Sequence, residues 1–395
     1  MSAITVAGGL YRERCLMPEW DEVYGSAGRA AAALSGHVDD ITVRSYAPDE
    51  TAAKVEPYAT MYGFVVRPTP IEQTISFEYI HSLSVPVIRP AALPRARAPL
   101  NVSDEVVLRF GMLEGSAVVN ADRCVYDPQS AFDPEPFAAN RSTARHLAIV
   151  GNQREICALG DNIDAVAAAR SLLQSGAEVV IIKGGPSGAR VVEAVGETHV
   201  EAYQTENVWK IGSGDVFSAM FAAQWGVHRA APVEAARLAS RAAAVYVNTM
   251  ALPVPSADDL RQLQLPPATI AAGRVYLAGP FFDVGQRWLV EEARRCLLDL
   301  GLPVFSPVHD VGLGEAMAVV PADLEALRGC DRVFAILDGL DSGTLFEVGY
   351  ARALEKPVYA LARAVPEGGL KMVTGSGCRV FADFVTAVHH ATWRS

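Results

Sequence analysis

Residues 332–362, RVFAILDGLDSGTLFEVGYARALEKPVYALA, decide the fold of the C-terminal part of the chain. An apolar run at 332–337 predicts a buried strand, residues 344–356 are typical of a helix, and a second apolar run at 358–362 predicts another strand. This alternation predicts a parallel sheet with helices on its faces. Ligands bind such sheets where loops leave the carboxyl ends of the strands, which is where this stretch places Asp341 and Glu347.

The same alternation extends in both directions from this stretch. On its N-terminal side we expect strands at 274–279 and 304–307, and helices at 288–301 and 322–330. Further upstream, apolar runs at 4–7, 117–119, 147–150 and 179–182 alternate with alanine-rich segments at 27–35, 162–175, 214–225 and 233–247. A proline-rich stretch separates the two regions. We therefore expect an α/β chain with a first domain at 1–252, a linker at 253–272 and a second domain at 273–395.

Composition narrows the class of protein. The chain has 395 residues, a formal net charge of −11 and a pI near 5.3, so a nucleic-acid partner, which requires a basic surface, is not expected. The six cysteines lie far apart without a CxxC motif, which argues against a disulfide framework or a zinc site and favours the cytoplasm. No run of 18 apolar residues occurs, so we expect no membrane span and no signal peptide.

The acidic residues of the opening stretch have two interpretations. Asp341 or Ser342 can cap the following helix while Glu347 complements its dipole, which is a purely structural role. Alternatively, a carboxylate at the ligand-binding edge of a sheet can take part in chemistry.

Four segments of the C-terminal region resemble the successive motifs of nucleoside 2-deoxyribosyltransferases. They are VYLAGPFFDVGQ (275–286), LGLPVFSP (300–307), ADLEAL (322–327) and DSGTLFEVGYA (341–351). The resemblance implies a flavodoxin- or Rossmann-like parallel sheet that needs no cofactor. It assigns Glu347 as the nucleophile, Asp323 and Asp341 as groups that hold and protonate the base, and Tyr276 as the residue that orients Glu347. It also implies that Gly279, Pro280 and Phe281 contact the substrate.

These residue types suit cleavage of an N-glycosidic bond. Positive charge develops at C1′ of the sugar, and a carboxylate can capture it as a glycosyl ester. Attack by a second base or by water then gives transfer or hydrolysis, and the sequence leaves both open. Related hydrolases of nucleoside 5′-monophosphates carry a GSxRGG phosphate loop where this chain has AGPFFDVG, which favours an unphosphorylated nucleoside. Lys371 keeps the monophosphate alternative open, and His309 follows a strand end where it can face the site.

A glycine-rich loop marks the candidate site of the N-terminal region. In VVIIKGGPSGARVV (179–192) and VWKIGSGDVFSAMFAAQWG (208–226), Gly212, Ser213 and Gly214 precede a helix, where their backbone N–H groups form an anion cradle. Asp215 lies beside that cradle. A helix cap is the alternative interpretation.

This region resembles the ribokinase-like (PfkB) sugar and nucleoside kinases, whose DTxGAGDxFxxG signature is similar to WKIGSGDVFSAM (209–220). The resemblance implies an α/β sandwich over residues 1 to about 250 that uses ATP and Mg²⁺, with Asp215 as general base and the Gly212–Gly214 amides as anion hole. The segments GNQRE (151–155), AGGLYRE (7–13) and GSAGRAAAALSG (25–36) supply the other expected site residues, and residues 74–90 are expected to form a lid. By this resemblance the phosphate- or nucleotide-binding residues include Asn152, Glu155 and Gly185, and the substrate-binding residues are Glu13, Gly25 and Gly28.

The N-terminal region also departs from the kinase pattern. Trp209 replaces the leading aspartate of the signature, and the asparagine usual after the first glycine pair is missing. Acceptor, monovalent-cation binding and turnover itself therefore stay open, and a nucleotide-sensing module without turnover is the alternative. Overall we expect a cytoplasmic enzyme of nucleoside metabolism that binds nucleosides or nucleobases. Because relatives of the C-terminal region build sites across subunits, we expect a homo-oligomer.

Overall fold

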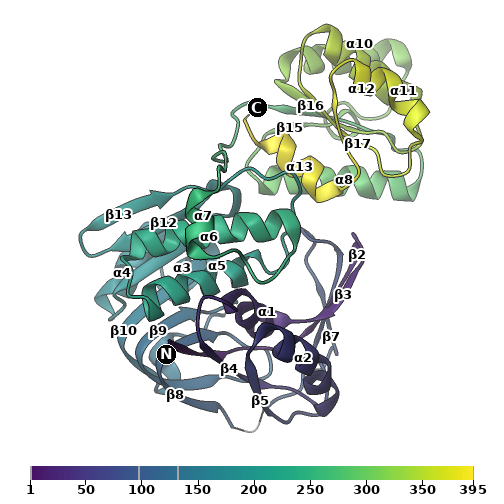
Figure 1. Ribbon diagram of the computed structural model, residues 1–395. Coiled ribbons are helices and arrows are strands. Elements are labelled where there is room, and N and C mark those ends of the chain that lie inside the picture. Colours follow the sequence, from purple (N-terminus) through teal and green to yellow (C-terminus); the bar gives the residue numbers. More distant parts are fainter. Residues whose placement is uncertain (1, 97, 131–132, 395) are drawn as a thin grey trace. The chain divides into compact units, whose positions relative to one another are not determined.

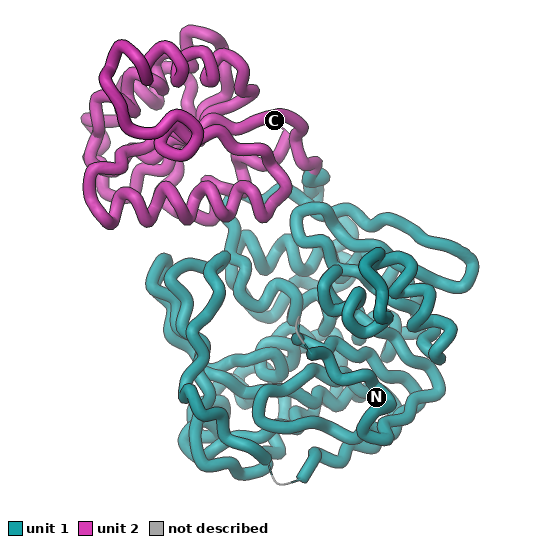
Figure 2. Tube along the Cα trace, turned by 180° about the vertical axis from the view of Figure 1, so that it is seen from behind, with its two compact units in different colours: residues 1–268 teal, residues 269–395 magenta. Residues whose placement is uncertain are grey.

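The computed structural model describes residues 2–96, 98–130 and 133–394. The chain forms two compact units, residues 1–268 and 269–395, which are coloured separately in Figure 2. No helix within the described residues is both long and apolar enough to cross a membrane.

A nine-stranded sheet organises the N-terminal unit (Figure 1). Its order is β13-β12-β11-β10-β9-β8-β1-β4-β5, and every neighbouring pair from β11 to β5 is parallel, whereas β12 and β13 add an antiparallel edge. In chain order the strands are β1 (Ala3–Ala7), β4 (Asp40–Tyr46), β5 (Val65–Thr69), β8 (Leu100–Phe110), β9 (Ala117–Asp127), β10 (Thr143–Asn152), β11 (Val179–Lys183), β12 (Ala189–Glu193) and β13 (Gly196–Val200).

Helices cover both faces of this sheet because successive strand side chains point to opposite sides. In β11, Val179 and Ile181 join the core that lies under one helical layer, while Val180 and Ile182 join the core under the other. The first layer contains α1 (Gly25–Leu34), α2 (Asp49–Tyr62), α5 (Ser213–Phe221) and α6 (Pro232–Thr249), and the second contains α3 (Gln153–Leu159) and α4 (Ala165–Gln174). The helix α5 continues as a π-helical segment, η3 (Ala222–Val227).

A second, four-stranded sheet stands beside α1. Its order is β3-β2-β6-β7, built from β2 (Arg12–Met17), β3 (Trp20–Val23), β6 (Ser76–His81) and β7 (Val87–Arg89). The segment 74–90 therefore supplies a strand pair, as the sequence predicts. Short helical turns, η1 (Phe137–Asn140) and η2 (Gly185–Ser187), complete the unit.

The C-terminal unit is built on a five-stranded, all-parallel sheet of order β15-β14-β16-β17-β18. The strands are β14 (Val275–Ala278), β15 (Val304–Phe305), β16 (Arg332–Ile336), β17 (Val358–Leu361) and β18 (Arg379–Phe381), and the helices are α8 (Val284–Asp299), α9 (Pro307–Asp310), α10 (Ala316–Gly329), α11 (Ser342–Ala353), α12 (Lys371–Gly375) and α13 (Phe384–Thr392), with the short turn η4 (Glu367–Leu370). The predicted α/β class with parallel sheets is confirmed for both units.

Two local expectations need correction. The helix expected at 322–330 begins six residues earlier, at Ala316, because Pro321 is accommodated inside α10 instead of starting it. Most of the segment expected to be a linker packs onto the N-terminal unit: α7 (Ala257–Gln262) buries Leu260 in that unit's core, and Ala268 N donates to Ala202 O at 2.8 Å. The proline-rich segment therefore lies near the boundary between the two units, but most of it belongs to the N-terminal unit.

Candidate active sites

In the C-terminal unit, the carboxyl edge of the sheet collects the predicted residues. Tyr276 lies on β14, and the loop after this strand carries Gly279, Pro280 and Phe281. Asp341 begins α11 directly after β16 and its loop, Glu347 follows in the second turn of α11, and Asp323 lies in α10.

A short hydrogen bond joins Tyr276 to Glu347. The Tyr276 hydroxyl donates to Glu347 Oε1 at 2.5 Å, and the tyrosine ring is fully buried in the core of the unit. Burial raises the pKa of Glu347 to about 7 because the charged form loses hydration, and the bond from Tyr276 opposes that rise. The nearby carboxylates Asp323 and Asp341 raise the pKa of Glu347 further by charge repulsion. Glu347 thus changes protonation near neutral pH, which is unusual for a glutamate and typical of functional sites.

The carboxyl group of Asp323 can accept a hydrogen bond or, when protonated, donate one. Its Oδ1 is buried and, within the described residues, makes no hydrogen bond. Burial raises the pKa of Asp323, which favours a protonated carboxyl group. Asp323 Oδ1 is therefore available to form a hydrogen bond with a substrate.

Asp341 caps α11. Its Oδ2 accepts hydrogen bonds from Thr344 N at 2.7 Å and from Thr344 Oγ1 at 2.9 Å, so the capping interpretation describes its contacts. The same carboxylate is close enough to Glu347 to raise its pKa. Capping and electrostatic influence on the site therefore coexist in one residue.

The loop after β14 is held by packing and by α8. A Cβ atom at Gly279 would lie 3.2 Å from Ile336 Cβ and 3.3 Å from Val290 Cγ2, so glycine lets this loop pass close to β16 and α8. Pro280 is buried, and the Phe281 carbonyl accepts from Arg287 Nε at 2.8 Å. The rings of Phe281 and Phe282 stack at a centroid distance of 5.3 Å. His309 contacts Glu291 (2.7 Å) and Ser306 (2.9 Å) through its two ring nitrogens.

In the N-terminal unit, the glycine loop opens α5 as the sequence predicts. Gly212 has φ +79°, and Ser213 and Gly214 are the first residues of the helix. A Cβ at Gly212 would lie 2.1 Å from Arg29 Nε, so the loop rests directly on the Arg29 side chain. The first N–H groups of a helix lack partners within it, so this end of α5 can bind an anion.

Asp215 is engaged on both oxygens. Its Oδ2 lies 3.1 Å from Arg29 Nη1, and its Oδ1 accepts from Gln129 Nε2 at 2.6 Å. Burial raises the pKa of Asp215 to about 6, and Arg29 limits that rise. Asp215 is therefore ionised at neutral pH, and each of its oxygens keeps a second lone pair that can accept a hydroxyl proton.

Glu13 is held by the same arginine. Arg29 is fully buried, donates to both Glu13 oxygens and contacts Tyr246 Oη at 2.9 Å. Gly25 has φ +56°, and a Cβ there would lie 2.4 Å from Gly9 O, so glycine is needed for close backbone approach. At Gly28 a Cβ would lie 3.1 Å from Leu10 Cδ2. The predicted substrate residue Glu13 thus belongs to a buried ion pair with Arg29. Sequence reasoning missed this pair because Arg29 is a single charge within an alanine-rich helix.

Asn152 and Glu155 form a capping box at the start of α3. Asn152 Oδ1 accepts from Glu155 N at 3.0 Å, and Glu155 Oε2 accepts from Asn152 N at 2.7 Å. Burial raises the pKa of Glu155, and the charge of Asp127 adds to that rise. Gly185 lies apart from these residues in sequence, in the exposed turn after β11, with φ +57°.

Asp127 and Lys183 belong to this site but were not predicted. Lys183 Nζ contacts Asp127 Oδ2 at 2.5 Å, and Ser218 Oγ donates to the same oxygen at 2.7 Å. Asp127 Oδ1 is buried and has no hydrogen-bond partner among the described residues. Asp127, with this unpaired oxygen, and the buried carboxylate of Glu155, which lies near enough to interact with it electrostatically, offer oxygen ligands of the kind that Mg²⁺ takes. Asp127 and Lys183 lie directly at the ends of the apolar runs of β9 and β11. This position at the strand ends is the sequence signal that could have revealed both residues.

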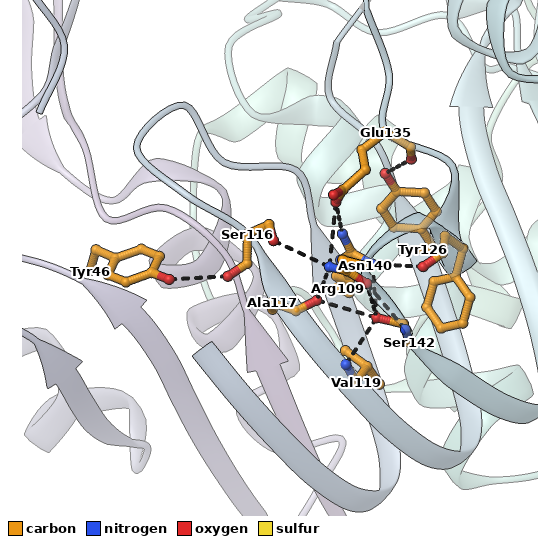
Figure 3. A network of polar contacts seen from close by, with 10 residues as sticks. Tyr46, Arg109, Ser116, Ala117, Val119, Tyr126, Glu135, Asn140 and Ser142 are labelled. Atoms are coloured by element: carbon orange, nitrogen blue, oxygen red, sulfur yellow. Dashed lines mark hydrogen bonds and ion pairs between the residues drawn. The ribbon is translucent and has the colours of Figure 1, made fainter. Parts of the chain in front are cut away.

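A polar network joins residues 135–142 to the strands β8 and β9 (Figure 3). The buried Arg109 pairs with Glu135, donates to Ser142 Oγ at 3.2 Å and lies 4.8 Å from the centre of the Tyr126 ring. Asn140 adds a bond to Ala117 O at 2.8 Å.

Family models match both regions of the chain. Residues 133–255 match the pfkB family of carbohydrate kinases, and residues 275–374 match nucleoside 2-deoxyribosyltransferases. Both resemblances stated from the motifs are thereby confirmed. The kinase match begins at residue 133, so it does not include Glu13, Gly25 or Gly28. No curated protein matches the chain in sequence.

Solved structures similar to the chain include ribokinase from Thermotoga maritima (17% identity, TM-score 0.49, covering 66% of this chain and 98% of that one). Fructokinase from Vibrio cholerae is 12% identical, with a TM-score of 0.46 over 63% of this chain and 94% of that one. A pyrophosphate-dependent kinase of the ribokinase family is 16% identical, with a TM-score of 0.46 over 66% of this chain and all of that one. These values are too low to transfer any feature of those proteins.

Proposed function

Given that this chain joins a pfkB-type region to a nucleoside 2-deoxyribosyltransferase-type region, we propose that its C-terminal unit cleaves or exchanges the N-glycosidic bond of a nucleoside or deoxynucleoside. The observation that carries this proposal is the buried Tyr276–Glu347 hydrogen bond, which holds a carboxyl group with a pKa of about 7 at the carboxyl edge of the sheet. Neither a cofactor nor a metal is needed for this chemistry.

The reaction follows from the three carboxyl groups. Ionised Glu347 attacks C1′ of the bound sugar, and a C1′–O bond forms while the C1′–N bond breaks. The bonding electrons leave with the base, and protonated Asp323 donates its proton to the base nitrogen. Tyr276 holds Glu347 in the attacking orientation and stabilises its charge. Water or a second base then attacks C1′ of the glycosyl ester and gives its proton to the Asp323 carboxylate. A new C1′–O or C1′–N bond forms, the bond to Glu347 breaks, and both carboxyl groups return to their starting states.

The charge of the site favours a nucleoside without a 5′-phosphate. Burial is the main cause of the raised pKa of Glu347, and the charges of Asp323 and Asp341 add to it, so an additional phosphate dianion beside these carboxyl groups would be disfavoured. The alternative, a nucleoside 5′-monophosphate N-hydrolase, needs a cation such as the exposed Lys371 to approach the ligand.

A nucleoside panel tests this proposal. Purified protein is incubated with purine and pyrimidine ribosides, deoxyribosides and their 5′-monophosphates, with and without a second base, and free base is measured by chromatography. We expect base release from unphosphorylated substrates that falls at least about 100-fold in Glu347→Gln. Glu325→Gln, an exposed glutamate on α10 paired with Arg328, is the matched control. Activity retained in Glu347→Gln would refute the assignment, and a clear preference for monophosphates would favour the alternative.

For the N-terminal unit we propose ATP-dependent phosphorylation of a sugar or nucleoside hydroxyl. The amides that open α5 bind the transferring phosphoryl group, and Asp215 accepts the proton of the acceptor hydroxyl. Asp127 and Glu155 are the residues suited to hold Mg²⁺, which neutralises phosphate charge when bound. Production of ADP that depends on an acceptor, and its loss in Asp215→Asn, test this assignment.

A nucleotide-sensing role without turnover is the alternative for this unit. It is favoured by one observation, the buried Arg29, which holds Glu13 and Asp215 together and so occupies groups that an acceptor would need. Calorimetric binding of nucleotide with no ADP formed from any acceptor would support it.

The remaining expectations concern the cell and the assembly. We propose a cytoplasmic homo-oligomer, supported by free cysteines throughout the described chain and by exposed apolar side chains of the C-terminal unit such as Met317 and Phe346. Light scattering coupled to size-exclusion chromatography tests the assembly, and a monomer would contradict it.

A further inference from the structure

Lys210 stands immediately before the glycine loop of the N-terminal unit, on a backbone that is fixed from two sides. Its N–H group donates to Ser82 Oγ at 3.2 Å, and the N–H group of the preceding Trp209 donates to Val247 O at 2.9 Å. The root of the Lys210 side chain is therefore held in place at the start of α5.

The ammonium group of Lys210 lacks an anionic partner. Nζ donates to Ser213 Oγ at 3.3 Å, and none of the carboxylates in residues 2–96, 98–130 and 133–394 forms an ion pair with it. Lys210 is partly buried, and a long hydrogen bond to a neutral hydroxyl compensates poorly for the hydration that its ammonium group loses. Burial lowers the pKa of Lys210, and the charge of Lys183 lowers it further.

Lys183 reaches the same loop from β11. Its Nζ lies 3.5 Å from the position that a Cβ of Gly214 would occupy, and it pairs with Asp127 at 2.5 Å. Two lysines thus meet adjacent residues of the loop, Ser213 and Gly214, while only Lys183 has a carboxylate. The first turn of α5 adds backbone N–H groups to this positive surface.

We propose that Lys210, together with Lys183, binds the phosphate chain of a polyphosphate ligand on the Gly212–Gly214 loop. Lys210 is then a specificity-determining residue, because its ammonium charge has no carboxylate partner among the described residues and is available to the phosphates. The chemistry is shared by inorganic pyrophosphate and by the phosphates of a nucleotide. This inference deepens the proposed kinase function of the unit and rests on it for the location of the phosphates, but it requires binding only, not turnover.

Calorimetry of the full chain with pyrophosphate, ATP and inorganic phosphate tests the proposal. We expect Lys210→Met to weaken binding of pyrophosphate or ATP about 10- to 100-fold, since a charge-assisted bond is lost, and Lys210→Arg to retain most of the affinity. Lys54→Met is the matched control, because Lys54 is exposed on α2 and pairs with Glu50. Equal affinities of wild type and Lys210→Met, or no binding of any of the three anions at millimolar concentration, would overturn the proposal.

Thermal unfolding gives a second readout that a merely structural lysine would not produce. Without anion, Lys210→Met is expected to have an equal or higher Tm than wild type, because an unpaired charge beside Lys183 is removed. At the same concentration of pyrophosphate or ATP, Lys210→Met is stabilised less than wild type, as binding that is about 10- to 100-fold weaker requires. A lower Tm of Lys210→Met without anion would contradict the unpaired state of Lys210. If wild type binds phosphate but forms no phosphorylated product, the kinase proposal fails and this inference stands.

Discussion

At the scale of single residues, the account depends on how Glu347 is kept reactive. Burial raises the pKa of Glu347 to about 7, and the Tyr276 hydroxyl is the contact that lowers it. A nucleophilic carboxylate has to be ionised, whereas the neighbouring Asp323 has to carry a proton. Burial raises the pKa of both groups, and at Glu347 alone the hydrogen bond from Tyr276 opposes that rise and favours the ionised form.

Tyr276→Phe is expected to move the pH dependence of base release. Without the donated bond the pKa of Glu347 rises above about 7, so the ionised fraction at neutral pH falls and the acidic limb of the pH–rate profile shifts to higher pH. The rate at pH 7 should fall about 10-fold and recover in part in alkaline buffer. Tyr350→Phe is the control, because Tyr350 lies on α11, the helix that carries Glu347. An unchanged acidic limb in Tyr276→Phe would show that Glu347 is not the titrating group.

Glu347 should also make stability depend on pH. Its folded pKa of about 7 lies above its ordinary value of 4.5, so the folded carboxyl keeps a proton that the unfolded one has lost. Stability therefore falls as pH rises from 4.5 to about 7 and stays lower above it. Glu347→Gln should be more stable than wild type at pH 8, by about 3 kcal/mol, and nearly equal at pH 4.5. Denaturant titrations at both pH values measure this, and equal stability at pH 8 would contradict the buried, raised state.

At the scale of elements, α11 both presents Glu347 and depends on Asp341 for its start. The loop after β16 ends at Asp341, whose Oδ2 accepts from Thr344 N and so sets where the helix begins. Because Glu347 lies six residues later on the same helix, capping also fixes the direction of the proposed nucleophile.

Two substitutions at Asp341 separate capping from charge. Asp341→Ala removes the cap and should cost about 1 kcal/mol of unfolding free energy, whereas Asp341→Asn keeps an N-cap and should cost little. Both remove a negative charge that raises the pKa of Glu347, so both should shift the acidic limb of the pH–rate profile to lower pH. If Asp341→Asn abolishes base release without affecting stability, Asp341 has a direct role toward the substrate.

The elements themselves were largely predictable, and the contacts between them were not. Buried parallel strands have apolar runs that can be recognised, so β11, β14, β16 and β17 lie where the sequence predicts them. The start of α10 was misplaced because Pro321 normally marks a first turn. The Arg29–Glu13–Asp215 cluster was missed because its members come from distant segments and no local pattern marks an ion pair.

At the scale of the whole molecule, each unit has its own sheet, core and candidate site. The polar residues proposed for glycosidic cleavage all lie in residues 269–395, and those proposed for phosphoryl transfer all lie in residues 1–268. The two chemistries therefore need no shared catalytic side chain.

Single substitutions should consequently separate the two activities. Asp215→Asn should abolish acceptor-dependent ADP formation and leave base release unchanged, and Glu347→Gln should do the reverse. Asp258→Asn, an exposed aspartate on α7 paired with Arg261, controls for the loss of one carboxylate. Loss of both activities in either variant, with an unchanged Tm, would show that the units depend on each other chemically.

The most direct test of the central claim is mass spectrometry of the protein after incubation with a slow 2-fluoro-2-deoxynucleoside. Fluorine at C2′ destabilises positive charge at C1′ and slows breakdown of the glycosyl ester, so the intermediate accumulates. The account predicts an intact mass increased by one fluorosugar, located by peptide mapping at Glu347, and absent from Glu347→Gln. Base release with no adduct on the protein, or an adduct on another residue, would contradict it.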